Sequence, residues 1–203
     1  MVINIFKRTK YIFFWDGIFS NWHESNFSFN NINYNCVEQY MMHQKAIFFN
    51  DIETSDKILK ELYPRKQKQL GREVKNFNND DWNVVKYEIV KNGIREKFNQ
   101  NSELKNYLIS FKNHIIVEAS PEDRIWGIGF SEDDALQNID KWGENLLGKI
   151  LTELASEFAK NKYSNISKKR DTCKYFRFEV CLPFQNSFIN FDKAIELIKK
   201  KRD

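Results

Sequence analysis

Helical spacing of apolar residues dominates this chain of 203 residues, and strand-like runs are few and short. The spacing predicts helices over residues 36–50, 51–63, 80–92, 94–99 and 102–109, and a long amphipathic helix that includes Leu146 and Phe158. Aromatic or β-branched runs predict strands at residues 11–15, 27–29, 32–34 and 115–117, and Asn30-Asn31 favours a tight hairpin between the middle two. The length suits one domain with a hydrophobic core, or one domain with an appendage.

The composition excludes several classes of protein. Hydrophobic residues make up 41% of the chain, with only 7 Gly and 3 Pro, which excludes a disordered or collagen-like polypeptide. No apolar run approaches the roughly 20 residues that a membrane helix needs. The first ten residues lack the apolar segment of a secretory signal, so we expect a soluble, cytoplasmic protein. Cys36, Cys173 and Cys181 are widely spaced and fit reduced thiols better than disulfides or a zinc site.

The net charge of +4 is unevenly distributed along the chain. Residues 1–159 carry 20 basic and 23 acidic side chains, whereas residues 160–203 carry 12 basic and 5 acidic ones. The second part begins with a polar segment typical of a linker. It continues with alternating Phe176, Phe178 and Val180, as in a half-exposed strand, and ends with a short basic helix over residues 192–202. We therefore expect a domain over residues 1–160 and a basic C-terminal strand-helix extension over residues 161–203.

The predicted helix that follows Cys36 carries charged residues within its apolar stripe. At 100° per residue, Glu38 and Lys45 lie only about 20° apart around the helix axis. Met41 and Phe48 lie on either side of that direction. Burying charged groups is costly unless they are paired or used in function. The pattern alone favours a structural ion pair over a functional one.

A second candidate segment, Glu118 to Gly129, directly follows the apolar strand at residues 115–117. Asp123 could orient a sugar hydroxyl or a water molecule, and Trp126 could stack on a planar base. The alternative is a turn capped by Asp123 with a core tryptophan. Asn145 is either a polar substrate contact or a helix cap, and Gly71-Arg72 offers groups to a phosphate but is too short for a P-loop.

Other chemistries lack their sequence signatures. His23, His43 and His114 show no spacing suited to metal ligation. The chain contains no GxSxG elbow, no GxGxxG after a strand and no Walker motif.

These segments, taken together and in order, resemble the NADAR family, which is also called YbiA-like. The resemblance covers about residues 11–159, and its most specific parts are EQYM…KA at residues 38–46 and DRIWGIG at residues 123–129. The matching segments are Phe13–Trp15, Ser25–Phe27, Tyr34–Ala46, Lys68–Arg72, Trp82, Lys97–Asn101, Val117–Gly129 and Trp142–Gly148.

The resemblance implies an α+β, helix-rich single domain and an N-glycosidase activity that requires no cofactor and no metal. Its substrates would be a phosphoribosylamino-pyrimidine intermediate of riboflavin synthesis, or ADP-ribose attached to guanine, free or in DNA. Both have a ribose C1′ bonded to a base-type nitrogen. The basic extension slightly favours ADP-ribosylated DNA as the partner, because basic side chains that neutralise DNA phosphates contribute binding affinity.

The resemblance also implies roles for single residues. Glu38 would stabilise the positive charge that develops on the ribose and take a proton from water. Lys45 would keep Glu38 ionised or contact a phosphate, and Asp123 would bind a ribose hydroxyl or share in water activation. Trp126 would stack on the leaving base. The remaining polar or phosphate contacts would come from Asn26, Arg72, Gly127 and Asn145.

Two other functions stay open. The first is a module that binds ADP-ribose or a related nucleotide without cleaving it. The second is an interaction protein whose C-terminal strand and helix pair with a partner.

Overall fold

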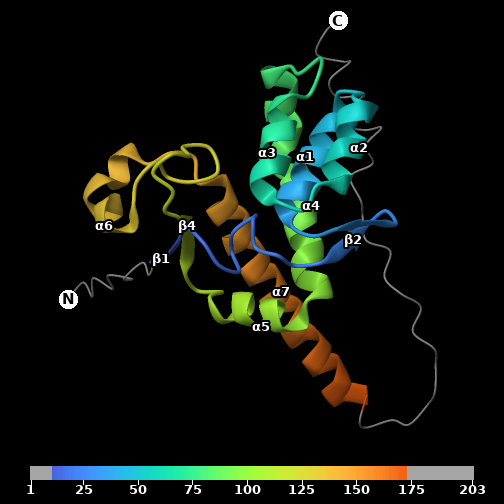
Figure 1. Cartoon of the computed structure of the whole chain (residues 1–203). Helices are drawn as coiled ribbons and strands as arrows, with labels where there is room; N and C mark the ends of the chain where they lie inside the picture. The colour runs from blue at the N-terminus through green and yellow to red at the C-terminus, as the bar shows by residue number, and fades with distance from the viewer. Residues whose placement is uncertain (1–10, 173–203) are drawn as a thin grey trace, which may run out of the picture.

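A computed structural model describes residues 11–172 and confirms a helix-rich α+β fold (Figure 1). Four short strands are present among these residues: β1 (Tyr11–Phe14), β2 (Phe27–Phe29), β3 (Ile32–Tyr34) and β4 (Ile115–Glu118). The helices are α1 (Val37–Phe48), α2 (Ile52–Lys60), α3 (Pro64–Arg72), α4 (Asn79–Gln100), α5 (Ser102–Ser110), α6 (Glu132–Ala135), a 3-10 helix (Leu136–Lys141) and α7 (Leu146–Thr172).

The four strands form two separate pairs. β1 and β4 pair in parallel, with Phe14 opposite Glu118. β2 and β3 form the predicted antiparallel hairpin, and Asn30 and Asn31 turn with φ angles of 50° and 62°. Two consecutive left-handed residues fit the twist of a hairpin, and asparagine tolerates that conformation better than most residues.

Helix α1 lies at the centre of the helical part. It contacts α2, α3 and α4, and Figure 1 shows these helices side by side. Its Tyr40 is packed in the same core cluster as Ile58 of α2 and Phe98 of α4. Helix α7 packs against β4 and α5, so the long C-terminal helix joins the parallel strand pair to the helices.

Two of the predicted helices are in fact one. The sequence predicts a break near Asn92-Gly93, but α4 continues through both residues. A Cβ atom at Gly93 would lie 2.4 Å from the ring of Tyr40. The glycine therefore permits close packing between α4 and α1, and does not end the helix.

Helix α3 has no counterpart among the predicted helices, because its sequence is mostly polar. Pro64 occupies the first turn, where its missing N–H costs no hydrogen bond. Only Gln67 and Gly71 of this helix are buried, so it lacks the broad apolar stripe that reveals a helix in a sequence.

The C-terminal helix is longer than the sequence predicts. In place of a polar linker after Lys160, α7 continues to Thr172, and no Gly or Pro interrupts residues 149–172. The predicted strand at 176–180, the predicted helix at 192–202, Cys173 and Cys181 lie outside the described residues. Cys36 is a buried free thiol. No helix within residues 11–172 has the length and hydrophobicity of a membrane span.

Candidate functional site

A cavity of about 530 Å³ lies where the chain leaves the parallel strand pair. Because β1 and β4 run in the same direction, the loops that follow them leave from the same edge. Both loops line the cavity, and α3 completes its wall. A rigid strand pair thus holds two loops in a fixed relation, which is a common way to build a binding site.

Aromatic and charged side chains dominate this wall. The loop after β1 contributes Trp15, Asn21 and Trp22. Helix α3 contributes Lys68 and Arg72, and the β4 side contributes Glu118, Asp123 and Trp126.

The Glu38 side chain is buried beside this cavity, with only 3% of the residue exposed. Its Oε1 atom has no hydrogen-bond partner. Burial raises the pKa of Glu38 to about 7, while Lys68, a hydrogen bond from the Trp22 side chain and Arg72 lower it. Asp123 raises it further, so four wall residues act on the charge of this buried carboxyl group at the start of α1.

The start of α1 fixes the position of Glu38. The Cys36 side chain caps the helix by accepting the Gln39 N–H at 3.5 Å. The Glu38 N–H lies in the first turn, where it has no partner within the helix, and it donates to the Asn21 carbonyl at 2.9 Å. The cavity loop and α1 are therefore joined through the backbone of Glu38.

Asp123 and Trp126 each combine a structural contact with a place on the cavity wall. Asp123 Oδ1 accepts the N–H groups of Ile125 and Trp126, at 2.9 and 2.8 Å, and so caps a turn. Trp126 packs partly against the main core cluster. Both residues also line the cavity. The two interpretations that the sequence leaves open for this segment are therefore compatible with each other.

Helix α3 brings two cations to the cavity. Arg72 is a predicted site residue, whereas Lys68 enters the prediction only as the first residue of the matching segment Lys68–Arg72. Four residues separate them, so they lie on the same face of the helix. The spacing places Lys68 beside Arg72 only if the segment is a helix, and the sequence did not predict this helix.

Lys45 does not reach the cavity. Its Nζ donates to the Gly71 carbonyl at 2.7 Å and lies 4.0 Å from the centre of the Phe77 ring. Seven residues of helix separate Lys45 from Glu38 by about 10 Å along the axis, which outweighs their shared direction around it. The cations that lower the pKa of Glu38 are Lys68 and Arg72.

Asn145 and Gly127 hold the cavity wall from behind. Asn145 accepts the Glu118 N–H at 3.0 Å and donates to the Ile116 carbonyl at 3.1 Å, so its amide bonds the free edge of β4 like a neighbouring strand. A Cβ atom at Gly127 would lie 2.9 Å from the Glu118 carbonyl oxygen. Neither residue lines the cavity, and both position the end of β4.

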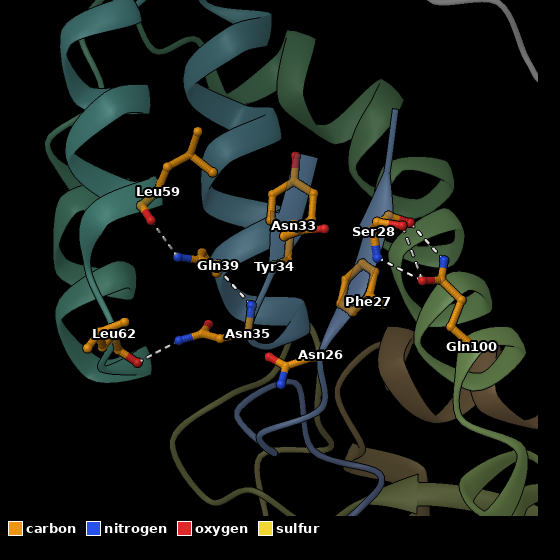
Figure 2. A pocket seen from close by; sticks show the side chains of 10 residues that line it. All are labelled: Asn26, Phe27, Ser28, Asn33, Tyr34, Asn35, Gln39, Leu59, Leu62 and Gln100. Carbon is orange, nitrogen blue, oxygen red and sulfur yellow. Dashed lines mark hydrogen bonds between the residues drawn. The ribbon is translucent and has the colours of Figure 1, made fainter. Parts of the chain in front are cut away.

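Asn26 lines a different cavity, of about 510 Å³, beside the β2–β3 hairpin (Figure 2). Most amides around it already have partners. Gln39 donates to the Leu59 carbonyl at 3.2 Å, and Gln100 donates to the Ser28 carbonyl at 2.8 Å. The structure therefore separates Asn26 from the other predicted site residues.

Glu118 is a further candidate site residue to which the sequence prediction gave no role. It is the last residue of β4, and its Oε2 atom is buried without a partner. Burial raises its pKa to about 8, with Asp123 and Glu38 adding to the rise and Lys68 opposing it. The available signal was a carboxylate at the end of an otherwise apolar strand.

Within residues 11–162, no group of three or more His, Cys, Asp or Glu side chains is arranged to hold a metal ion.

Comparison with known proteins matches the chain to a family over most of this domain. The family model described as the NADAR domain matches residues 13–159. N-glycosidase R617 of Acanthamoeba polyphaga mimivirus is 43% identical over 168 residues, which cover 74% of this chain and 98% of the relative. A riboflavin biosynthesis protein of Vibrio vulnificus is 26% identical over 84% of this chain and 44% of its own length.

A solved structure has the same fold. The NMR structure of YbiA from Escherichia coli superposes with a TM-score of 0.64 and 26% sequence identity, and the match covers 76% of this chain and 88% of YbiA. The segments that build the cavity, from the loop after β1 to Trp126, all lie within the residues that the family model matches. The chain belongs to the NADAR domain family.

Proposed function

We propose that this protein is an N-glycosidase that hydrolyses the bond between a ribose C1′ and the nitrogen of a base. The observation that carries the proposal is Glu38, a buried carboxylate with an unpartnered oxygen beside a cavity lined by tryptophans and cations. A volume of about 530 Å³ is within the usual range for small-molecule sites. Relatives named N-glycosidases support the same class of reaction.

Glu38 is proposed to act on the reacting centre. Breaking the C1′–N bond leaves positive charge on the ribose, as in other glycosidases. A carboxylate held in a poorly solvated position stabilises that charge strongly and takes a proton from the attacking water. Asp123, whose Oδ1 is used by the turn, would bind a ribose hydroxyl or share in orienting the water.

The other wall residues are proposed to bind the substrate. Lys68 and Arg72 present two positive charges from one face of α3, which suits a phosphate or diphosphate. Trp126 would stack on the base, and Trp22 offers a second aromatic surface. Lys45 would contribute by holding the Gly71 carbonyl, and Asn145 and Gly127 by positioning the end of β4. Asn26, directly before β2, would contribute from outside this cavity.

Two amine glycosides are proposed as substrate classes. One is a phosphoribosylamino-pyrimidine, since one relative is named a riboflavin biosynthesis protein. The other is ADP-ribose attached to a guanine base. Both place a ribose beside a phosphate and a planar base, which the cavity's cations and tryptophans match.

The direct test is to incubate the protein with each glycoside and detect the released base by mass spectrometry. We expect release with at least one substrate, and a loss of about 10²–10⁴-fold in kcat for Glu38→Gln. The matched control is Glu103→Gln, an exposed carboxylate on α5, which should retain wild-type activity. Tight binding of both substrates without turnover would instead identify a nucleotide-binding module.

A further inference from the structure

We propose that Glu118 is the general acid of this site and protonates the nitrogen that leaves the ribose. The inference rests on the proposed N-glycosidase function and adds a second catalytic carboxyl group to it. It follows from the placement of Glu118, the unmet hydrogen-bonding capacity around it, and the charges that face it.

The backbone of Glu118 is held on both sides. Its N–H donates to Asn145 Oδ1 at 3.0 Å, and its carbonyl accepts the Ile128 N–H at 2.9 Å. Phe14 pairs opposite it in the parallel register. The Glu118 side chain therefore lines the cavity from a backbone that is held in place. A catalytic side chain needs such a fixed backbone to reach the reacting atom in the right geometry.

Unmet hydrogen-bonding groups concentrate at this cavity. Among the residues whose side chains the structure describes, four buried polar side-chain atoms have no partner. Three of them belong to this site: Asn21 Oδ1, Glu38 Oε1 and Glu118 Oε2. Buried polar atoms are nearly always hydrogen-bonded, so a cluster of exceptions points to partners supplied by a ligand or a water. Two carboxyl groups therefore share the same region of unmet hydrogen bonding.

The charges facing Glu118 favour its protonated form. Asp123 from the loop and Glu38 from α1 both disfavour a negative charge on it, whereas Lys68 from α3 favours one. The pKa of Glu38 is lowered by Lys68 and also by Arg72. Lys68, Arg72 and a hydrogen bond from Trp22 favour the carboxylate form of Glu38, whereas only Lys68 opposes the rise in the pKa of Glu118, so Glu118 is the carboxyl group that keeps its proton. Two carboxyl groups with different environments divide the acid and base roles in this way in other enzymes.

The proposed step is balanced. Water forms a bond to C1′ while the C1′–N bond breaks, and the electrons of that bond remain on the nitrogen. The Glu118 proton passes to this nitrogen, so the base leaves as a neutral amine. The proton of the attacking water passes to Glu38. Proton exchange with solvent then returns Glu118 to its acid form and Glu38 to its carboxylate.

The test uses the full chain and two leaving groups on one sugar phosphate. The first substrate is the amine glycoside that the wild-type protein cleaves, and the second is the matched 4-nitrophenyl glycoside, whose phenolate leaves without a proton. Glu118→Gln should lower kcat on the amine glycoside by about 10²–10⁴-fold. It should change hydrolysis of the nitrophenyl glycoside by less than about threefold, because no acid is needed there. Glu38→Gln should impair both, and Glu103→Gln neither.

The pH profile supplies a second readout. The wild-type kcat on the amine glycoside should fall at alkaline pH as Glu118 loses its proton, and Glu118→Gln should lose this alkaline limb while retaining the acidic one. Equal impairment of Glu118→Gln on both leaving groups, or an unchanged alkaline limb, overturns the role of Glu118. Failure of the proposed function looks different, since the wild-type protein would then cleave neither glycoside.

Discussion

At the level of single residues, Glu38 and Glu118 occupy positions where burial penalises their charged forms. A protein selected for stability alone would place neutral or apolar side chains there. Glu118 has an ordinary pKa of 4.5 in the unfolded chain and about 8 in the folded protein. The folded state therefore binds more protons than the unfolded state between these values, and its stability falls as pH rises through that window.

Glu118→Gln should remove this penalty. We expect the variant to have a larger free energy of unfolding than the wild type at pH 8.5, by about 1–3 kcal/mol, and nearly the same value at pH 4.5. Urea denaturation at the two pH values measures both. Glu103→Gln is the control for a surface charge change. An identical difference at both pH values would show that Glu118 carries no buried charge.

Lys97 should make the stability of the protein depend on pH in the opposite direction. It is 1% exposed, its Nζ donates to the Ser20 carbonyl at 3.0 Å, and burial lowers its pKa to about 7. The unfolded chain keeps this proton up to about pH 10.5, so stability rises with pH between 7 and 10.5. Lys97→Met should cost about 1–3 kcal/mol at pH 9.5 and less at pH 7. Exposed Lys60→Met is the comparison, and equal losses at both pH values would contradict the buried neutral amine.

At the level of elements, prediction succeeded where an apolar stripe or a turn signal was present. The hairpin at Asn30-Asn31 and helix α1 follow directly from such signals. Helix α3 was not predicted, because its sequence is polar and tertiary contacts hold it in place. Gln67 donates to the Glu61 carbonyl at 2.7 Å, and Gly71 packs on Met42. The predicted break at Gly93 is also wrong because of a tertiary contact. The sequence does not distinguish a glycine that makes room for a neighbouring ring from a glycine that ends a helix.

Gly93→Ala tests that account of α4. Alanine favours helix by about 1 kcal/mol over glycine, so a merely local view expects stabilisation. We expect destabilisation by about 1–3 kcal/mol, because the new methyl group would meet the Tyr40 ring at 2.4 Å. Thermal and urea unfolding measure the change. Val84→Ala, at an exposed position of the same helix, should be nearly neutral, and a more stable Gly93→Ala would refute the packing role.

At the level of the whole molecule, the site exists only because distant segments meet. The parallel pairing of β1 with β4 brings the loop after Phe14 beside Asp123, and α1 and α3 add Glu38 and Lys68. The motifs in the sequence pointed to Glu38, Arg72, Asp123 and Trp126. They did not separate Asn26 and Lys45 from these residues, because hydrophobic periodicity assigns residues to a face of their own element and says little about which other element that face meets.

The last question at this scale concerns the predicted basic extension over residues 161–203. It is whether the part that follows the described residues of α7, residues 173–203, assists binding of a nucleic-acid substrate. Helix α7 is described up to Thr172, and 74% of this chain matches 98% of the mimivirus relative, so we expect a truncation after Thr172 to keep the NADAR domain folded. We expect this truncation to hydrolyse a free glycoside within about twofold of the wild-type rate. Binding to ADP-ribosylated duplex DNA should weaken, and the slope of log affinity against log salt should become shallower by about 0.9 for each phosphate that the shortened protein no longer neutralises.

A charge-neutral variant separates electrostatics from any other effect of the truncation. Lys199, Lys200, Lys201 and Arg202 changed to Gln in the full chain should reproduce most of the shallower slope. Exposed Lys57, Lys60, Lys75 and Lys149 changed to Gln remove the same number of charges from the domain itself and provide the matched control. If all three proteins bind DNA with one salt slope, the extension contacts no phosphates. The nearly neutral catalytic domain would then favour a small phosphoribosyl metabolite, because such a ligand needs only the two cations of α3.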